Sequence, residues 1–200
     1  MIDTVIFELS GRPVLLIDLI SSLLGLTCVF LAGRNSKYNF WVGYLYTAAL
    51  FLLFWHRNLL ACLMLQPVSL CINFIGHYRW THPKKEESAA NGELKVSYLS
   101  WVQRIFTVCS VVLLAFAWGS LLDHLFPADP HPYLDSLVTV LILAAQYLSA
   151  QKKWDCWIVW LLVNITQFTL HLSVGNLAMS LVSALYLING IASLFHWKKL

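Results

Sequence analysis

Seven long apolar runs, separated by mostly short polar breaks, fill almost the whole of this 200-residue chain. A helix that crosses a bilayer needs about 20 apolar residues, so seven such helices would use roughly 140 of the 200. The runs predict membrane-spanning helices near residues 13–32, 38–55, 59–80, 102–125, 134–151, 155–172 and 177–197. The expected fold is an all-α integral membrane protein with no room for a soluble catalytic domain.

Composition excludes several other classes of protein. Hydrophobic residues make up 59% and charged residues 12% of the chain, whereas soluble domains average about 25% charged. The thirteen Lys and Arg are scattered through the breaks without interleaved aromatics, which argues against nucleic-acid binding. The chain has no HExxH, GxSxG or Walker A motif and no CxxC pair among its five cysteines. We therefore expect no metal, no cofactor and no enzymatic activity.

The distribution of Lys and Arg predicts the orientation, because basic residues concentrate in cytoplasmic loops. With the N-terminus outside, only Arg12 and Arg57 fall outside. The eleven that fall inside are Arg34, Lys37, Arg79, Lys84, Lys85, Lys95, Arg104, Lys152, Lys153, Lys198 and Lys199. We therefore expect a multi-pass protein with its C-terminus in the cytoplasm, which requires an odd number of spans.

A weak internal repeat suggests how the spans are organised. A shift of 117 residues aligns Asp18 with Asp135, Ala61 with Ala178 and Trp80 with Trp197. Two triplets on either side of one linking span would share the same orientation, as in parallel-repeat transporters, with a chance match as the alternative. The expected division is a first three-helix bundle at 1–81, a cytoplasmic linker and linking helix at 82–126, and a second three-helix bundle at 127–200. The charged tract THPKKEESAANGELKVS within the linker is expected to be solvated.

Polar side chains recur at three- and four-residue spacing in the span at 155–172, which is otherwise rich in Ile, Val and Leu. Those that share one helix face are Trp157, Trp160, Asn164, Gln167 and His171. Because polar groups are costly in hydrocarbon, this face should line a protein interior or a water-filled cavity. The alternative is that it hydrogen-bonds neighbouring helices, with Trp154 and Trp157 in an interfacial aromatic belt.

Side-chain amides on other spans extend the pattern. The five amides that are candidates for one site are Gln66, Asn73, Gln146, Asn164 and Asn189. An amide both donates and accepts, so the set can pair with hydroxyls and an amide on a small polar ligand. Amides also serve as ordinary contacts between helices, but five in one small bundle favour a ligand site.

Acidic residues are missing from the middle of the spans. Asp18, Asp123 and Asp135 all lie toward span ends, and the seven histidines are dispersed. Ion-coupled transporters and proton pumps usually hold a carboxylate or histidine relay near mid-membrane. The sequence therefore predicts downhill transport that is not coupled to an ion gradient.

With these residues placed, the chain closely resembles the PnuC family of bacterial nicotinamide riboside transporters over nearly its whole length. The segments that carry the resemblance are NFWVGY from Asn39, LLACLMLQ ending at Gln66, NFIGHYRW from Asn73, DSLVTVLILAAQYLSAQKK from Asp135, WIVWLLVN from Trp157, and Asn189-Gly190. The most specific element is WxxxN at Trp160 and Asn164. One departure is Tyr46, because the second span of the family commonly carries Asn there.

The resemblance implies a three-plus-one-plus-three fold related to SWEET transporters, in the bacterial inner membrane. It also implies facilitated diffusion of nicotinamide riboside, which a cytosolic kinase then phosphorylates and traps. The expected partners are this vitamin, the lipid bilayer and, as a functional link, the kinase; a homo-oligomer is compatible with such a chain. One alternative is a carrier of a related vitamin, such as thiamine, riboflavin or another nucleoside. Another is a membrane scaffold that moves no substrate.

The chemistry of nicotinamide riboside suits the candidate residues. Its pyridinium ring is a permanent cation that stacks on an indole, and Trp160 is the stacking candidate, with Tyr46 as a second aromatic. Its carboxamide and ribose hydroxyls can pair with side-chain amides. The expected substrate-binding set is Trp160, Asn164, Gln66, Asn73, Gln146, Tyr46 and Asn189.

Overall fold

A computed structural model of the chain describes residues 4–9, 12–56, 60–125, 132–173 and 177–200. It contains seven α-helices: α1 (Leu16–Gly33), α2 (Asn39–His56), α3 (Leu60–Thr81), α4 (Trp101–Leu125), α5 (Pro132–Ala150), α6 (Cys156–Ser173) and α7 (Leu177–Trp197). Each expected span falls on one of these helices, with ends that agree to within three residues, so the seven-helix fold is confirmed. The breaks expected at 56–58, 127–132 and 173–176 lie mostly outside the described residues, and so does Arg57.

The composition of the helices is that of a membrane protein. Among the described residues, four helices are long and apolar enough to cross a bilayer, namely α1, α4, α5 and residues 179–197 of α7. The apolar part of α6 is slightly shorter. Gln66, Asn73 and Arg79 lower the hydropathy of α3. The least apolar helix of the bundle thus carries two of the amides expected at the site.

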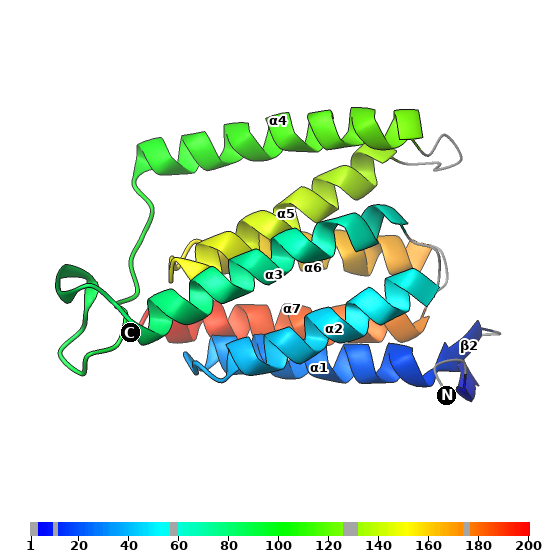
Figure 1. The fold of residues 1–200 in the computed structure, drawn as a ribbon, viewed down its shortest axis with the longest axis horizontal. Helices are drawn as coiled ribbons and strands as arrows, with labels where there is room; N and C mark the ends of the chain where they lie inside the picture. Colours follow the sequence, from blue (N-terminus) through cyan, green and yellow to red (C-terminus); the bar gives the residue numbers. More distant parts are fainter. Residues whose placement is uncertain (1–3, 10–11, 57–59, 126–131, 174–176) are drawn as a thin grey trace.

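Six of the helices close into a ring. The contacts run from α1 to α2, α2 to α3, α3 to α5, α5 to α6, α6 to α7, and from α7 back to α1. Helix α4 lies outside this ring and packs along α5, where Val111 and Ala115 meet Val140 (Figure 1). Two helix triplets therefore surround one central space, and their relation as a parallel repeat stays a prediction.

A short antiparallel β-hairpin precedes α1, so the all-α expectation is wrong for this segment. Strand β1 (Val5–Leu9) pairs with β2 (Arg12–Leu15). The hairpin continues directly into α1. At this junction the Leu15 N–H donates to Asp18 Oδ2 at 3.1 Å. Residues 13–15 are apolar and would suit either a strand or a spanning helix, which explains why the predicted span begins three residues before α1.

The segment at 82–100, which we name the connector, is not simply a solvated linker. It contains a 3-10 turn, η1 (Lys85–Glu87), and an antiparallel bridge between Ser88 and Leu94. Ser97 pairs with the α5–α6 turn, since its N–H donates to the Lys152 carbonyl at 3.2 Å and its carbonyl accepts from the Trp154 N–H at 2.9 Å. Backbone pairing with another segment thus orders a stretch that its own composition would leave solvated.

The connector covers one end of the bundle, which we name the basic end. The turn at 151–155 and the C-terminus lie at the same end (Figure 1). A mainly aromatic cluster fills this end, made of Phe40, Trp80, Leu94, Leu148, Cys156, Trp157 and Trp197. The Trp80 indole donates to the Ser149 carbonyl and the Trp197 indole to the Ala32 carbonyl, both at 3.2 Å. Trp157 is only 1% exposed, so it belongs to this core and not to an interfacial belt.

Charged groups fix the connector to the helices around it. Arg104 Nε donates to Asp155 Oδ1 at 2.8 Å, and the other oxygen of Asp155 accepts from the Leu99 N–H at 2.8 Å. Arg79 pairs with Glu87 at 3.1 Å.

Lys152, in the turn between α5 and α6, is 2% exposed. Its Nζ lies 4.7 Å from the centre of the Trp80 ring. Burial lowers the pKa of Lys152, and the nearby Glu93 opposes that shift. The basic end therefore contains a buried cation under the connector.

Candidate functional site

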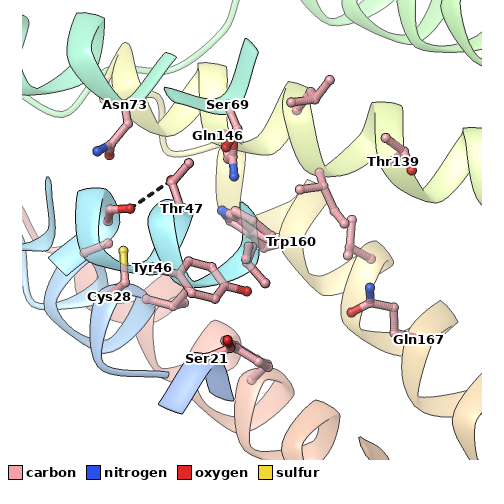
Figure 2. A pocket seen from close by; sticks show the side chains of 18 of the residues that line it. Ser21, Cys28, Tyr46, Thr47, Ser69, Asn73, Thr139, Gln146, Trp160 and Gln167 are labelled. Carbon is pink, nitrogen blue, oxygen red and sulfur yellow. Dashed lines mark hydrogen bonds between the residues drawn. The ribbon is translucent and has the colours of Figure 1, made fainter. Parts of the chain in front are cut away.

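The ring of helices encloses a cavity of about 420 Å³. Its lining comes from α1, α2, α3, α5, α6 and α7, and none of the residues of α4, all of which are described, takes part. Figure 2 shows Ser21, Tyr46, Gln146 and Trp160 pointing into this space from four different helices. The volume suits a small organic molecule, since ligand pockets commonly measure about 300–1,000 Å³.

Six of the seven residues expected at the site line this cavity, namely Tyr46, Gln66, Asn73, Gln146, Trp160 and Asn164. The seventh, Asn189, is not part of the lining. Its amide donates to the Val29 carbonyl at 3.2 Å, across the contact between α7 and α1. A ligand contact for Asn189 stays a prediction, while its observed hydrogen bond is one between helices.

The polar face of α6 forms one wall of the cavity. Trp157, Trp160, Asn164, Gln167 and His171 all belong to the lining, as expected for residues spaced by three and four on one helix face. Asn164 is 4% exposed and lines the cavity. Because buried polar groups are nearly always satisfied, this amide is positioned to bind something inside the cavity.

The amides of α3 and α5 differ in how firmly they are held. Gln146 Oε1 accepts from Ser69 Oγ at 2.9 Å, which leaves its amide hydrogens for the cavity. Asn73 donates to the Phe40 carbonyl at 3.1 Å, and so keeps its side-chain oxygen as an acceptor. Gln66 donates to the Cys62 carbonyl of its own helix at 3.2 Å. The wall therefore offers both donors and acceptors.

Sequence reasoning did not include α1 in the site, although this helix contributes part of the wall. Ser21 and Ser22 line the cavity, and Ser21 is 4% exposed. The available signal was a pair of serines inside an otherwise apolar run. Two serines are common at contacts between membrane helices, so the pair did not by itself indicate a site.

The two ends of the cavity differ. At the basic end it stops at Phe40 and Trp157, which belong to the cluster beneath the connector. At the opposite end its lining reaches Asp18, in the first turn of α1, and His171, in the last turn of α6. The cavity thus has a packed aromatic floor at the basic end and extends to the helix ends at the other.

Charge is sparse in the cavity. Among the described residues, Asp18 is the only Asp, Glu, Lys or Arg in the lining, and it lies at the end away from the floor. The middle of the cavity therefore presents amides, hydroxyls and aromatic rings. Such a surface can bind a neutral or cationic polar molecule weakly enough to release it.

A ring of apolar helices around a cavity that carries amides, hydroxyls and aromatic rings, with a packed floor at one end, is the architecture of a membrane transport protein. The sequence model of the nicotinamide mononucleotide transporter family matches residues 15–199, and the chain belongs to this family. The family assignment agrees with the PnuC resemblance seen in the sequence and makes the protein a transporter.

Individual relatives support the assignment. The nicotinamide riboside transporter PnuC of Escherichia coli (strain K12) is 25% identical over 82% of this chain and 77% of its own length. The riboflavin/roseoflavin transporter RibM of Streptomyces davaonensis is 26% identical over 90% of this chain and 83% of its own. The crystal structure of the vitamin B3 transporter PnuC superimposes with a TM-score of 0.72 and 22% identity, over 90% of this chain and 79% of that one, which shows a shared fold.

Proposed function

We propose that this protein carries nicotinamide riboside across the bacterial inner membrane by facilitated diffusion, and that a cytosolic kinase traps the product by phosphorylation. The observation that carries the proposal is the cavity itself, where Trp160 stands among the amides of Gln146 and Asn164. The family and the names of the PnuC relatives support this choice of substrate class.

Each part of nicotinamide riboside has a suitable counterpart in the lining. The pyridinium cation would stack on Trp160, an interaction worth roughly 0.5–2 kcal/mol. The carboxamide would pair with Asn164 or Gln146, which have unused hydrogen-bonding capacity. No acidic residue of the described lining lies deep in the cavity, so the cation would not be held too tightly for release.

The same lining disfavours phosphorylated forms of the ligand. A phosphate group needs Lys, Arg or clustered N–H donors, and the described lining contains no Lys or Arg. Although the family is described by the mononucleotide, this cavity favours the riboside. A phosphorylated product would then be unable to leave by the route through which the riboside entered.

The proposal places the basic end in the cytoplasm, because most Lys and Arg gather there. An Asn91→Cys variant tests this, since Asn91 lies at the exposed tip of the connector. We expect an impermeant maleimide to label it only after the cells are permeabilised, above the level given by the native cysteines of the parent chain. Labelling in intact cells would reverse the orientation.

Transport is tested with purified protein in proteoliposomes that contain no kinase. We expect labelled nicotinamide riboside to equilibrate without ATP, and an imposed sodium or proton gradient to leave the initial rate unchanged. Accumulation above the outside concentration under either gradient would contradict facilitated diffusion. A complete lack of uptake would contradict the carrier function.

A ligand panel tests the substrate. Nicotinamide riboside, nicotinamide mononucleotide, thiamine and riboflavin are titrated calorimetrically against the same preparation. We expect the riboside to bind most tightly, because thiamine lacks the ribose hydroxyls and the carboxamide that the amides would satisfy. Tighter binding of riboflavin would assign the chain to the function named for the RibM relative.

A further inference from the structure

The two halves of the cavity wall differ in chemistry. Around the ring, α7, α1 and α2 are consecutive, and so are α3, α5 and α6. Five of the six side-chain amides in the described lining lie on the second group of helices, and the sixth, Asn39, lies on α2 in the first group. Hydroxyl groups line both halves but are more frequent on the first group, where we name four of them the hydroxyl wall: Ser21, Tyr46, Ser183 and Tyr186.

Ser21 gives the clearest indication that this wall has a ligand. It is 4% exposed, it lines the cavity, and its Oγ has no hydrogen-bond partner among the described residues. A buried hydroxyl inside a helix usually bonds to the carbonyl four residues earlier, as Ser136 does in α5. Ser21 does not, so its hydroxyl is left for a group that enters the cavity.

The two tyrosines of the hydroxyl wall are held together by a close helix contact. Tyr46 on α2 and Tyr186 on α7 hydrogen-bond to each other through their hydroxyls. Gly25 on α1 makes room for the pair, because an added Cβ would clash with the Tyr186 hydroxyl and lie 3.0 Å from Tyr46 Cζ. One bond between two hydroxyls uses one hydrogen, so the other O–H hydrogen can still donate.

We propose that the hydroxyl wall is the subsite for the sugar of the ligand, with Ser21 as a residue that determines specificity. A hydroxyl rotates to donate or to accept, so a wall of hydroxyls matches a ribose better than it matches a rigid, planar amide. The ring and carboxamide would then occupy the half that holds Trp160 and the amides. This inference rests on the proposed function, because it takes a vitamin bearing a sugar as the substrate.

Double-mutant cycles test the proposal, with nicotinamide riboside and its 2′-, 3′- and 5′-deoxy analogues titrated against wild type and Ser21→Ala. We expect Ser21→Ala to weaken binding of the riboside about 3- to 10-fold, as for one lost hydrogen bond. One of the three analogues should bind both proteins equally, which identifies the hydroxyl that Ser21 contacts. The thermal midpoint of the unliganded variant should not fall, because Ser21 Oγ has no partner to lose.

Tyr186→Phe provides a second test and Thr107→Ala a control. Tyr186→Phe should lower the affinity for the riboside more than the affinity for at least one deoxy analogue. Thr107→Ala should leave all four affinities unchanged, because Thr107 bonds within α4, away from the cavity. The sugar subsite is wrong if Ser21→Ala and Tyr186→Phe each lower the affinity for the riboside and for every analogue by the same factor. It is also wrong if neither variant lowers any of these affinities. If wild type does not bind the riboside at all, the proposed function fails and the subsite fails with it.

Discussion

Ser69 Oγ on α3 donates a 2.9 Å hydrogen bond to Gln146 Oε1 on α5, and so joins the two helix triplets inside the cavity. The bond also fixes which way the Gln146 amide faces, because its oxygen is engaged and its NH₂ group must point elsewhere. Figure 2 shows the two side chains meeting at the edge of the space that holds Trp160. A contact between helices thus orients a group of the proposed binding site.

Ser69→Ala should therefore weaken ligand binding without removing a ligand contact. Loss of the bond lets the Gln146 amide rotate, and the cost of re-orienting it should lower the affinity for nicotinamide riboside about 2- to 10-fold. Calorimetric titration measures this, with Gln146→Ala as the stronger variant. Equal affinities for Ser69→Ala and wild type would mean that the orientation of Gln146 does not matter for binding.

Asn164→Ala should be more damaging, because Asn164 is a buried amide that lines the cavity. Loss of one hydrogen-bonding group in a partly desolvated site costs about 1–3 kcal/mol, which corresponds to roughly 5- to 150-fold in affinity. Thr166→Ala, in the same helix but bonded to the Leu162 carbonyl, is the matched control. An Asn164→Ala protein that folds normally and binds as tightly as the control would remove Asn164 from the site.

The charge of the ligand can be tested at Trp160. Trp160→Leu should lower the affinity for a ligand with a cationic ring by about 2- to 30-fold, the range given by a cation–π interaction. Trp160→Phe should lower this affinity less. Riboflavin, which carries no permanent cation, serves as the comparison in the same binding assay. If the Leu variant loses the same factor for both ligands, Trp160 contributes shape and apolar contact but not attraction to the cation.

Leu94 is the apolar anchor of the connector, at 3% exposed in the cluster with Trp80 and Trp197. Leu94→Ala should cost about 2–5 kcal/mol of stability, because a buried leucine is replaced by a cavity. The thermal midpoint in detergent should fall clearly, whereas Lys95→Ala at the exposed neighbouring position should leave it nearly unchanged. Identical midpoints for the two variants would show that the connector does not stabilise the bundle.

Lys152 should give the protein a specific dependence on pH. Its pKa is lowered by burial from the ordinary value of 10.5, so between the two values the unfolded chain binds more protons than the folded one. Stability relative to Lys152→Met should therefore rise as the pH is raised through this window and stay level below it. Unfolding curves of both proteins measure the difference, and a fall with pH would mean that stacking on Trp80 raises the pKa instead.

Most of the fold could be predicted from the sequence because long apolar runs leave a chain few alternatives to spanning helices. The helix ends were found from polar breaks, as at Lys152-Lys153. The connector was misjudged because its order comes from pairing with the α5–α6 turn and from the burial of Leu94, and neither is visible in its own composition. Burial of Lys152 was missed for the same reason.

The candidate site could be predicted where several polar residues repeat along one helix face. This was the case for α6, whose stripe from Trp157 to His171 lines the cavity. The sequence did not indicate that Asn189 donates to the Val29 carbonyl, because an amide that bonds a neighbouring helix and one that faces a cavity look alike in a sequence. Nor did it indicate Ser21, where the evidence is a missing hydrogen bond.

The tip of the connector offers a practical opportunity. Gly92 adopts a φ of +76°, has nothing within 4 Å of the position a Cβ would occupy, and lies between Asn91 and Glu93, which are also exposed. Foreign sequence is tolerated best at such tips. A circularly permuted fluorescent protein grafted at 91–92 would sit on a segment attached to both helix triplets, and could convert ligand-driven motion of the carrier into an optical signal in living cells.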